Sequence, residues 1–217
     1  MMAVRDNRVP QVVRVGVYVD GFNLYYGLRS LRGRRHLWLD LRALSLRLLR
    51  TGQTLAAVRY FTAPVRGDAR ALARQQTYQA ALEALGVDVV LGRFQEQRAS
   101  CRACGVSWRT YEEKQSDVAL AAAMVRDVAL DLVDMVLLLS ADSDLCAAVE
   151  AVRQMDARRG GKTRVVTVFP PGRRSDGLRL ASDAWFPLGD ALIRQSQLPD
   201  LVPGRDDALY HRPAHWS

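Results

Sequence analysis

Histidine and cysteine are scarce in this chain of 217 residues, which contains three of each. The histidines, at positions 36, 211 and 215, do not cluster with a candidate nucleophile. A glycine-rich phosphate loop of the nucleotide-binding kinds is also missing from the sequence. These absences argue against a serine hydrolase and against an NTPase.

Long apolar runs are absent too. The longest, such as 118–125 and 135–139, are far too short to span a bilayer. The opening residues lack the apolar core of a signal peptide, and an odd number of cysteines does not suggest a disulfide framework. We therefore expect a protein of the reducing cytoplasm that has no membrane partner.

Lysine is nearly missing from the basic residues. Of 31 lysines and arginines, only Lys114 and Lys162 are lysines. Basic residues outnumber the 23 acidic ones, which gives a net charge of +8. This excess favours an acidic partner such as nucleic acid, although the base composition of a genome can also produce an arginine bias.

Short apolar segments alternate with helical patterns along most of the chain. Strands that are continuous apolar runs, separated by helices, indicate a parallel sheet covered on both faces. We therefore predict one α/β domain over 13–190, with three α/β/α layers and a central, mainly parallel sheet of five or six strands. The strands are predicted at 13–20, 54–63, 87–94, 135–140 and 163–170, with a short last strand at 184–188; the clearest helices are predicted at 39–50, 68–86, 116–132 and 143–157.

Two segments depart from this alternation. Residues 95–115 show no consistent period and are predicted to form an excursion that carries Cys101 and Cys104. Residues 191–217 are rich in proline and charge, and we expect them to form a C-terminal tail that frays. Within the regular part, Ser116 is the predicted cap of one helix and Gly86 ends another.

Four aspartates stand where predicted strands end or helices begin. Asp20 ends the first strand, Asp142 and Asp144 follow the fourth, and Asp117 opens the helix before the fourth. In a parallel sheet, strand ends and the starts of the following helices share one edge, and the usual reversal of winding favours adjacency of the first and fourth strands. We therefore expect these carboxylates to converge at that edge.

Converging carboxylates repel one another unless a cation or protons offset their charge. Mg²⁺ or Mn²⁺ would do so, because these ions take oxygen ligands; beside a phosphodiester they orient an attacking water and stabilise the leaving oxygen. Each aspartate taken alone has a simpler explanation as a helix cap or turn residue. Asp117, however, continues an apolar stripe along its helix and should point inward.

Four segments together resemble successive motifs of the NYN domain, a PIN-like ribonuclease fold, in its LabA-like branch. The resemblance spans about residues 13–190 and depends on the order of its motifs more than on any one of them. The segments are VYVDGFNLYYGL (17–28), EEKQSDVALAAAMVRD (112–127), VLLLSADSDLCAAVEAVR (136–153) and RLASDAWFPL (179–188).

The resemblance implies a metal-dependent ribonuclease site in which aspartates bind Mg²⁺ or Mn²⁺. Family members often carry glycine where Gln115 and Ala141 stand here, which concerns loop geometry more than metal binding. The implied metal ligands are Asp20, Asp117 and Asp142; Asp144 and Asn23 would hold the metal waters and the attacking water, with Ser140 in support and Asp183 at an auxiliary acidic position.

Two further groups of residues suit RNA. The loop after the fifth strand lies at the same edge, and its Arg173, Arg174 and Arg179 are predicted to bind phosphates, the alternative being a solvated loop. In the excursion, Lys114 and Trp108 belong to a mixture of charge and aromatic surface typical of single-strand binding. Trp108 has the alternative role of anchoring the excursion to the core.

Cys101 and Cys104 have the spacing of a zinc knuckle, but structural zinc takes four ligands. We therefore expect two reduced thiols, and zinc only if a second protomer of a homodimer supplies the other pair. Cys146 lies on a predicted core-facing helix and is interpreted as a small buried hydrophobe.

The main hypothesis is a metal-dependent endoribonuclease that hydrolyses single-stranded or unpaired RNA. The first alternative is a regulatory RNA-binding module of the same fold with a weak or silent site. A second alternative is a Toprim-like metal site, which also uses Asp-x-Asp after a strand. Toprim sites carry a glutamate after the first strand, where this chain has Asp20.

Overall fold

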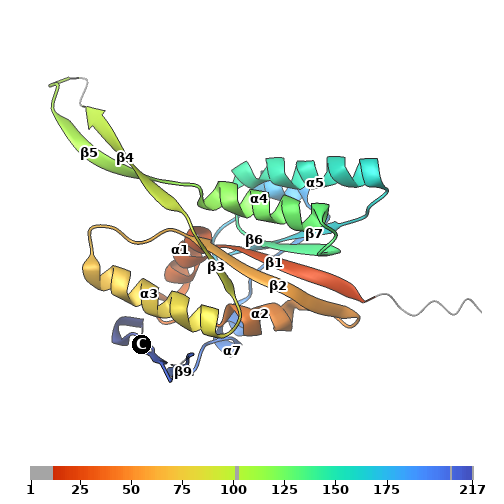
Figure 1. The fold of residues 1–217 in the computed structure, drawn as a ribbon, viewed down its shortest axis with the longest axis horizontal. Helices are drawn as coiled ribbons and strands as arrows, with labels where there is room; N and C mark the ends of the chain where they lie inside the picture. The colour runs from red at the N-terminus through yellow and green to blue at the C-terminus, as the bar shows by residue number, and fades with distance from the viewer. Residues whose placement is uncertain (1–11, 101–102, 206, 217) are drawn as a thin grey trace, which may run out of the picture.

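A six-stranded parallel sheet forms the centre of the computed structural model. The structure describes residues 12–100, 103–205 and 207–216, and it describes the backbone but not the side chains at 32, 93–99 and 108–114. The strand order is β3-β2-β1-β6-β7-β8, and each neighbouring pair is parallel (Figure 1). The strands are β1 (Val13–Asp20), β2 (Gln53–Thr62), β3 (Asp88–Leu91), β6 (Met135–Leu139), β7 (Arg164–Phe169) and β8 (Ala184–Pro187).

Helices cover both faces of the sheet because its central strands are apolar on both sides; every residue of β6 is buried. One core contains leucines from α1 and α2, Tyr78 of α3 and Ile193 of α7, and the other contains Leu120 of α4, Val149 of α5 and Leu178 of α6. The predicted α/β/α architecture is confirmed. The helices are α1 (Gly21–Arg32), α2 (Leu41–Leu48), α3 (Ala69–Ala84), α4 (Ser116–Ala129), α5 (Cys146–Arg159), α6 (Asp176–Ala181) and α7 (Asp190–Gln195).

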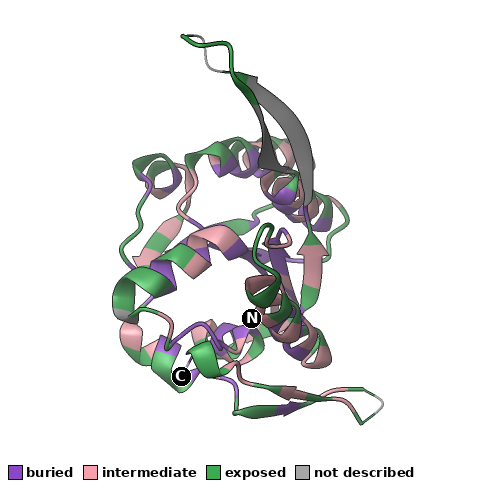
Figure 2. Cartoon of the chain, turned by 90° about the vertical axis from the view of Figure 1, so that its left-hand side faces the viewer, coloured by how far each residue is buried: buried purple, intermediate pink, exposed green. Residues whose placement is uncertain are grey.

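The first and fourth predicted strands, β1 and β6, are neighbours, as the sequence predicted. From β1 the chain adds strands in one direction as far as β3, and from β6 in the other direction as far as β8. The winding therefore reverses between β1 and β6, and a crevice forms at the carboxyl ends of two strands where this happens. Figure 2 looks onto that edge.

The segment predicted as an irregular excursion is a hairpin. β4 (Arg93–Ser100) and β5 (Ser107–Lys114) pair antiparallel over their whole length and extend away from the sheet (Figure 1). The prediction missed them because segments rich in polar and charged residues lack the apolar alternation by which strands are recognised. No helix in the described parts of the chain is long and apolar enough to cross a bilayer.

The expectation of a frayed tail is wrong. Trp216 is 8% exposed, and its ring centroid lies 6.2 Å from that of Trp38 and 5.7 Å from that of Tyr78. Leu198 and Val202 are also buried in the core, so several contacts fix a segment whose composition suggested a loose end. Its regular elements are β9 (Leu201–Pro203), β10 (Leu209–His211) and the short helix η2 (Ala214–Trp216).

The start of α4 also differs from the prediction. Ser116 is the first helical residue, and the cap position belongs to Gln115, which makes no side-chain capping bond. Gln115 has φ 91° and ψ −16°, in the left-handed region that glycine adopts most easily. The glycine that the family resemblance would place here therefore has a physical reason, and Gln115 is strained.

We expect Gln115→Gly to raise the free energy of unfolding by about 0.5–1 kcal/mol. Relief of left-handed strain contributes roughly 1–2 kcal/mol, and the greater flexibility of an unfolded glycine offsets about half of it. Urea unfolding measures the change. The control is Gln154→Gly inside α5, which should lose about 1 kcal/mol. Equal losses in both variants would contradict a left-handed Gln115.

Candidate metal centre

Asp20 is the last residue of β1 and the N-cap of α1, and it is held by three hydrogen bonds. The backbone N of Asn23 donates to Oδ1 at 2.9 Å, the Nδ2 of Asn23 donates to Oδ2 at 2.6 Å, and the Oγ of Ser140 donates to Oδ2 at 2.7 Å. Asp20 is only 3% exposed. Its carboxylate is therefore fixed and largely shielded from water.

Gly21 explains why α1 can begin so close to the sheet. A Cβ at this position would lie 2.6 Å from the carbonyl oxygen of Phe61 and 2.9 Å from the ring of Tyr60. Any larger residue would push α1 away from β2 and carry Asn23 with it. The Asp-Gly-x-Asn motif thus has a packing role as well as a chemical one.

Asp142 lies in the loop that follows β6. The Oγ of the fully buried Ser140 accepts from the backbone N of Asp142 at 3.0 Å, while donating to Asp20. Oδ1 of Asp142 in turn accepts from the backbone N of Asp144 at 3.0 Å and caps the short helix η1 (Ser143–Leu145). Ser140 therefore ties the carboxylate of Asp20 to the backbone of Asp142.

Asp117 completes the cluster from the first turn of α4, which packs against β1 and η1. One carboxylate oxygen from each of Asp20, Asp117 and Asp142 lies within 4.8 Å of the other two. Farther along α4, Leu120 and Met124 are fully buried, as the apolar stripe predicted. The structure thus brings three of the four predicted aspartates together; we call them the aspartate cluster.

The electrostatics of the aspartate cluster favour a cation. Burial raises the pKa of Asp20, the negative charge of Asp142 adds to the rise, and the hydrogen bonds from Asn23 and Ser140 oppose it. The charged form of Asp20 is thus penalised by its surroundings. A small ion with oxygen ligands would offset that penalty, and three carboxylates at this separation fit the ligand preference of Mg²⁺ or Mn²⁺.

The capping alternative is also realised, since Asp20 caps α1 and Asp142 caps η1. Capping alone does not explain why two caps from distant parts of the sequence meet each other. Asp117 lies in the first turn of α4, where the helix dipole favours an acidic residue, and this alone does not explain why it meets the other two. The two functions are compatible, because capping fixes the carboxylates where a metal would need them.

Among the three loop arginines, Arg173 alone touches a residue of this site. Its Nη1 donates to Oδ1 of Asn23 at 3.3 Å, and its guanidinium lies 5.5 Å from the ring centroid of Tyr26. Arg174 and Arg179 instead contact Asp176, at 3.4 Å and 3.2 Å. The guanidinium of Arg174 also lies 5.4 Å from the ring centroid of Trp185.

Asp144 and Asp183 are not part of the aspartate cluster. Asp144 is exposed on η1. Burial raises the pKa of the Cys146 thiol, and the negative charges of Asp142 and Asp144 add to the rise. Asp183 accepts from the backbone N of Val165 and pairs with Arg153. The auxiliary position predicted for Asp183 is therefore wrong, because it precedes β8 and so lies at the amino edge of the sheet.

Several predicted residues lie outside the described positions: Cys101, and the side chains of Trp108 and Lys114. Their proposed roles stay predictions. Cys104 is an exposed free thiol near the end of the hairpin, and Cys146 is partly buried against the core of α4–α6. Neither described cysteine is in a disulfide.

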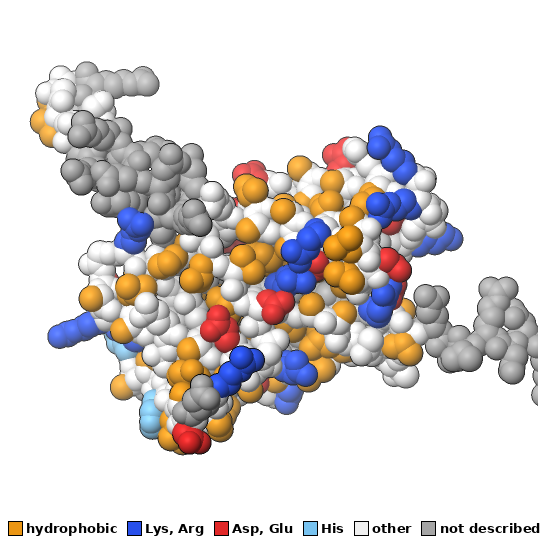
Figure 3. Space-filling model, viewed as in Figure 1, with side chains coloured by type: hydrophobic (Ala, Val, Ile, Leu, Met, Phe, Trp, Pro, Cys, Tyr) orange, Lys and Arg blue, Asp and Glu red, His pale blue; other side chains and the backbone are white. Residues whose placement is uncertain are grey.

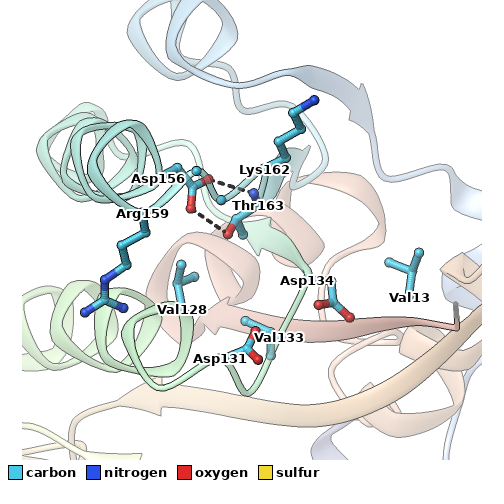
Figure 4. A pocket seen from close by; sticks show the side chains of 11 residues that line it. Val13, Val128, Asp131, Val133, Asp134, Asp156, Arg159, Lys162 and Thr163 are labelled. Carbon is cyan, nitrogen blue, oxygen red and sulfur yellow. Dashed lines mark hydrogen bonds between the residues drawn. The ribbon is translucent and has the colours of Figure 1, made fainter.

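A hollow of about 650 Å³ at the amino edge of the sheet also contains acidic residues (Figure 4). Its Asp156 accepts from the backbone N of Thr163 at 2.6 Å and from the Oγ1 of Thr163 at 3.2 Å. Asp134 accepts from the backbone N of Arg14 at 2.8 Å and pairs with its side chain. Among the described residues, these carboxylates do not form a group of three that could hold an ion, as the aspartate cluster does.

An aromatic cavity beside the aspartate cluster was missed by the sequence analysis. It has a volume of about 330 Å³ and lies between α1 and α3; we call it the α1–α3 cavity. Gly21, directly after Asp20, is one of its lining residues, and Tyr26 is another. No local pattern in the sequence signals it, because the cavity is lined by residues of two helices that lie far apart along the chain.

Comparison with known proteins places the chain in a family. The 6-hydroxy-3-succinoylpyridine 3-monooxygenase HspA of Pseudomonas putida is 27% identical over 241 aligned positions, which cover 94% of this chain and 75% of that protein. A Vibrio parahaemolyticus protein of unknown function shares the fold, with a TM-score of 0.58 and 20% identity over 84% of this chain and 97% of that one. The family model of the NYN domain matches residues 14–188, and the chain therefore belongs to the NYN domain family.

Proposed function

We propose that this NYN domain, of the LabA-like branch, is an endoribonuclease that hydrolyses single-stranded or unpaired RNA with Mg²⁺ or Mn²⁺. The observation that carries the proposal is the aspartate cluster at the carboxyl edge, with three oxygens within 4.8 Å of one another. The nuclease-like fold of the family and the net charge of +8 support a polyanionic substrate. We place the reaction in the cytoplasm.

The residues of the site have two roles in hydrolysis, which are to bind the ion and to position its ligands. Asp20, Asp117 and Asp142 would hold the ion, and a divalent ion supplies an acidified water and stabilises the leaving oxygen. Asn23 and Ser140 keep Asp20 in place through their hydrogen bonds. This fixed geometry lowers the reorganisation needed when a phosphodiester arrives.

The exposed residues of the site act on the substrate. Arg173, held against Asn23, binds a non-bridging oxygen of the phosphate. Asp144, exposed on η1 two residues after Asp142, accepts the proton of the attacking water, directly or through a second water. A new P–O bond then forms to the water oxygen as the ester P–O bond breaks, and the departing oxygen takes up a proton.

The carboxyl edge is assigned as the RNA-binding surface. On the face seen in Figure 3, lysine and arginine side chains are interspersed with aspartate and glutamate and form no continuous basic patch. Arg173 lies instead beside the aspartate cluster, stacked over Tyr26. Cations beside the scissile position give both binding and orientation.

The test uses end-labelled single-stranded RNA and DNA of matched sequence, with Mg²⁺, Mn²⁺ or EDTA. We expect internal cleavage of RNA with either metal, no cleavage in EDTA, and recovery when metal is restored. RNA binding with no cleavage under any condition would favour the regulatory module with a silent site. Neither binding nor cleavage would overturn the proposal.

Arg173→Ala should weaken RNA binding about equally for all sequences. A lost phosphate contact lowers the slope of log K against log salt by about 1, because one fewer counterion is released. Binding is measured in EDTA over a range of salt concentrations. Arg174→Ala is the matched control, since Arg174 contacts Asp176 and Trp185, and its slope should change less. Identical slopes in both variants would mean that Arg173 belongs to a solvated loop and binds no phosphate.

A second candidate function comes from the Pseudomonas relative, whose name states that it oxygenates a pyridine carrying a succinoyl group. The α1–α3 cavity, with aromatic walls and arginines, suits a small aromatic acid. A monooxygenase puts one atom of O₂ into the substrate and reduces the other to water with two electrons from a reductant. Oxygen uptake that requires both NADH and an aromatic acid would favour this candidate over RNA hydrolysis.

A further inference from the structure

The α1–α3 cavity has the size of a small-ligand site. Its volume of about 330 Å³ lies at the lower end of the range of roughly 300–1,000 Å³ that is typical of such sites. Its lining extends from Gly21, directly after Asp20, to Trp216. Its floor is formed by residues of the core, so it is a preformed feature of the fold.

Aromatic rings form much of its wall. Tyr25 and Tyr26 meet edge to face with ring centroids 5.3 Å apart, and Tyr60 and Tyr78 do the same at 6.0 Å. Burial raises the pKa of Tyr60 to about 12, so its hydroxyl stays neutral beside the Asp20 carboxylate. Such walls suit a flat ring, because stacking on aromatic side chains stabilises a base by about 1–3 kcal/mol.

The charge of the lining is positive. Arg29, Arg34 and Arg74 line the cavity, and neither Arg34 nor Arg74 takes part in a salt bridge among the described residues. The acidic lining residue is Asp68, whose Oδ1 already accepts from the backbone N of Ala71 at 2.9 Å. Asp68 also interacts with the charge of Arg74, but three cations against one carboxylate leave the lining with a net positive charge that complements an anionic group such as phosphate.

The cavity is connected to the aspartate cluster by direct contacts. Asn23 binds Asp20 and accepts from Arg173, and Arg173 lies over the ring of Tyr26, which lines the cavity. In addition, the ring of Tyr60, which lines the cavity, packs against Gly21, directly after Asp20. A strand with one phosphate at the cluster therefore has a neighbouring base within reach of the cavity.

We propose that the α1–α3 cavity holds one nucleobase of the RNA strand beside the scissile phosphate, with the phosphate attached to that nucleoside on Arg34 and Arg74. This inference rests on the proposed ribonuclease function. The polar group of Gln75 is already used, because its Nε2 donates to the carbonyl of Ala63 and its Oε1 accepts from the backbone N of Val65. Recognition is therefore by stacking and charge, with little discrimination among bases.

The test fills the cavity without altering the aspartate cluster. Ala71, on α3, lines the cavity, and Ala73, on the same helix, is exposed and does not line it. We expect the wild type to bind adenosine and uridine monophosphates in EDTA, measured by calorimetry. Ala71→Phe should weaken this binding, and that of a single-stranded RNA, at least tenfold. Ala73→Phe should leave both unchanged.

A second variant protects the test against a folding defect. Arg74→Ala leaves the cavity open and should weaken adenosine monophosphate binding at least fivefold while changing adenosine binding less than twofold. Equal affinity of wild type and both variants for the monophosphates would overturn the proposal. So would tighter binding of an aromatic carboxylate such as benzoate, displaced by Ala71→Phe, because the cavity would then be a small-acid site.

The readout separates the subsite from the enzyme activity. Binding is measured without metal and requires no cleavage. Monophosphate binding that Ala71→Phe abolishes, in a protein that cuts no RNA under any metal, would support the subsite and reject the ribonuclease function. RNA cleavage in a protein whose cavity binds no monophosphate would do the reverse.

Discussion

The Asp142→Asn variant should lose at least a hundredfold of RNA cleavage, or about 3 kcal/mol of transition-state stabilisation, while it keeps its fold. Asparagine preserves size, and its Oδ1 can still accept from the backbone N of Asp144, so the cap of η1 is retained. What is lost is one negative ligand oxygen of the aspartate cluster. Cleavage is measured on labelled single-stranded RNA at saturating Mn²⁺.

The same variant should be at least as stable as the wild type in EDTA. Burial and then the charge of Asp142 raise the pKa of Asp20, so the charged Asp20 weakens the metal-free fold. A carboxyl group with a raised folded pKa contributes stability below its ordinary pKa of 3.8, and that stability is lost as pH rises through the raised value. The advantage of Asp142→Asn should therefore grow from acid towards neutral pH, as thermal unfolding will show.

Added metal should stabilise the wild type more than the Asp142→Asn variant. Mn²⁺ raises the melting temperature of the wild type by mass action and should do so much less in Asp142→Asn. The control is Asp183→Asn, the same chemical change at the opposite edge of the sheet, which should keep both cleavage and metal response. If the aspartates are only caps, metal will stabilise no variant, and Asp142→Ala will merely lose about 1 kcal/mol.

The Asp127→Ala variant should lose about 3–5 kcal/mol of unfolding free energy, the usual consequence of removing one partner of a buried ion pair. Asp127 is 1% exposed and accepts from the hydroxyl of Tyr18 at 2.8 Å and from the Nε of Arg59 at 2.9 Å. Its loss leaves the buried hydroxyl and a mostly buried guanidinium without this acceptor. Urea unfolding measures the effect.

The matched control for this prediction is Asp88→Ala. Asp88 also pairs with Arg59, at 3.2 Å, but its side chain is 59% exposed, so its removal should lose less than about 1 kcal/mol. Cleavage per folded molecule should be unchanged in both variants, because neither residue touches the aspartate cluster. Similar losses of unfolding free energy for Asp127→Ala and Asp88→Ala would contradict the claim that burial makes the Asp127 pair the more important one.

The aspartate cluster could be predicted because the geometry of parallel sheets is strict. Residues after β1 and β6 must share the carboxyl edge, and the winding makes these strands neighbours. The same rule, applied strictly, excludes Asp183, which precedes β8 and so belongs to the opposite edge. The wrong assignment followed from a motif and not from strand direction.

Other features depended on contacts that no local pattern contains. Trp216 lies far along the chain from Trp38, and nothing near it in the sequence signals their packing. The α1–α3 cavity arises only when α1 and α3 are placed side by side on the sheet. Gln115 was the exception, since the family resemblance would place glycine at this position and so already raised the question of loop geometry.

Anomalous diffraction from crystals soaked in Mn²⁺ tests the central claim most directly, because it locates the ion itself. The prediction is a peak between the carboxylates of Asp20, Asp117 and Asp142, greatly weakened in crystals of Asp142→Asn. A saturating soak of wild-type crystals that leaves no peak among these three residues would contradict the metal centre and, with it, the proposed chemistry.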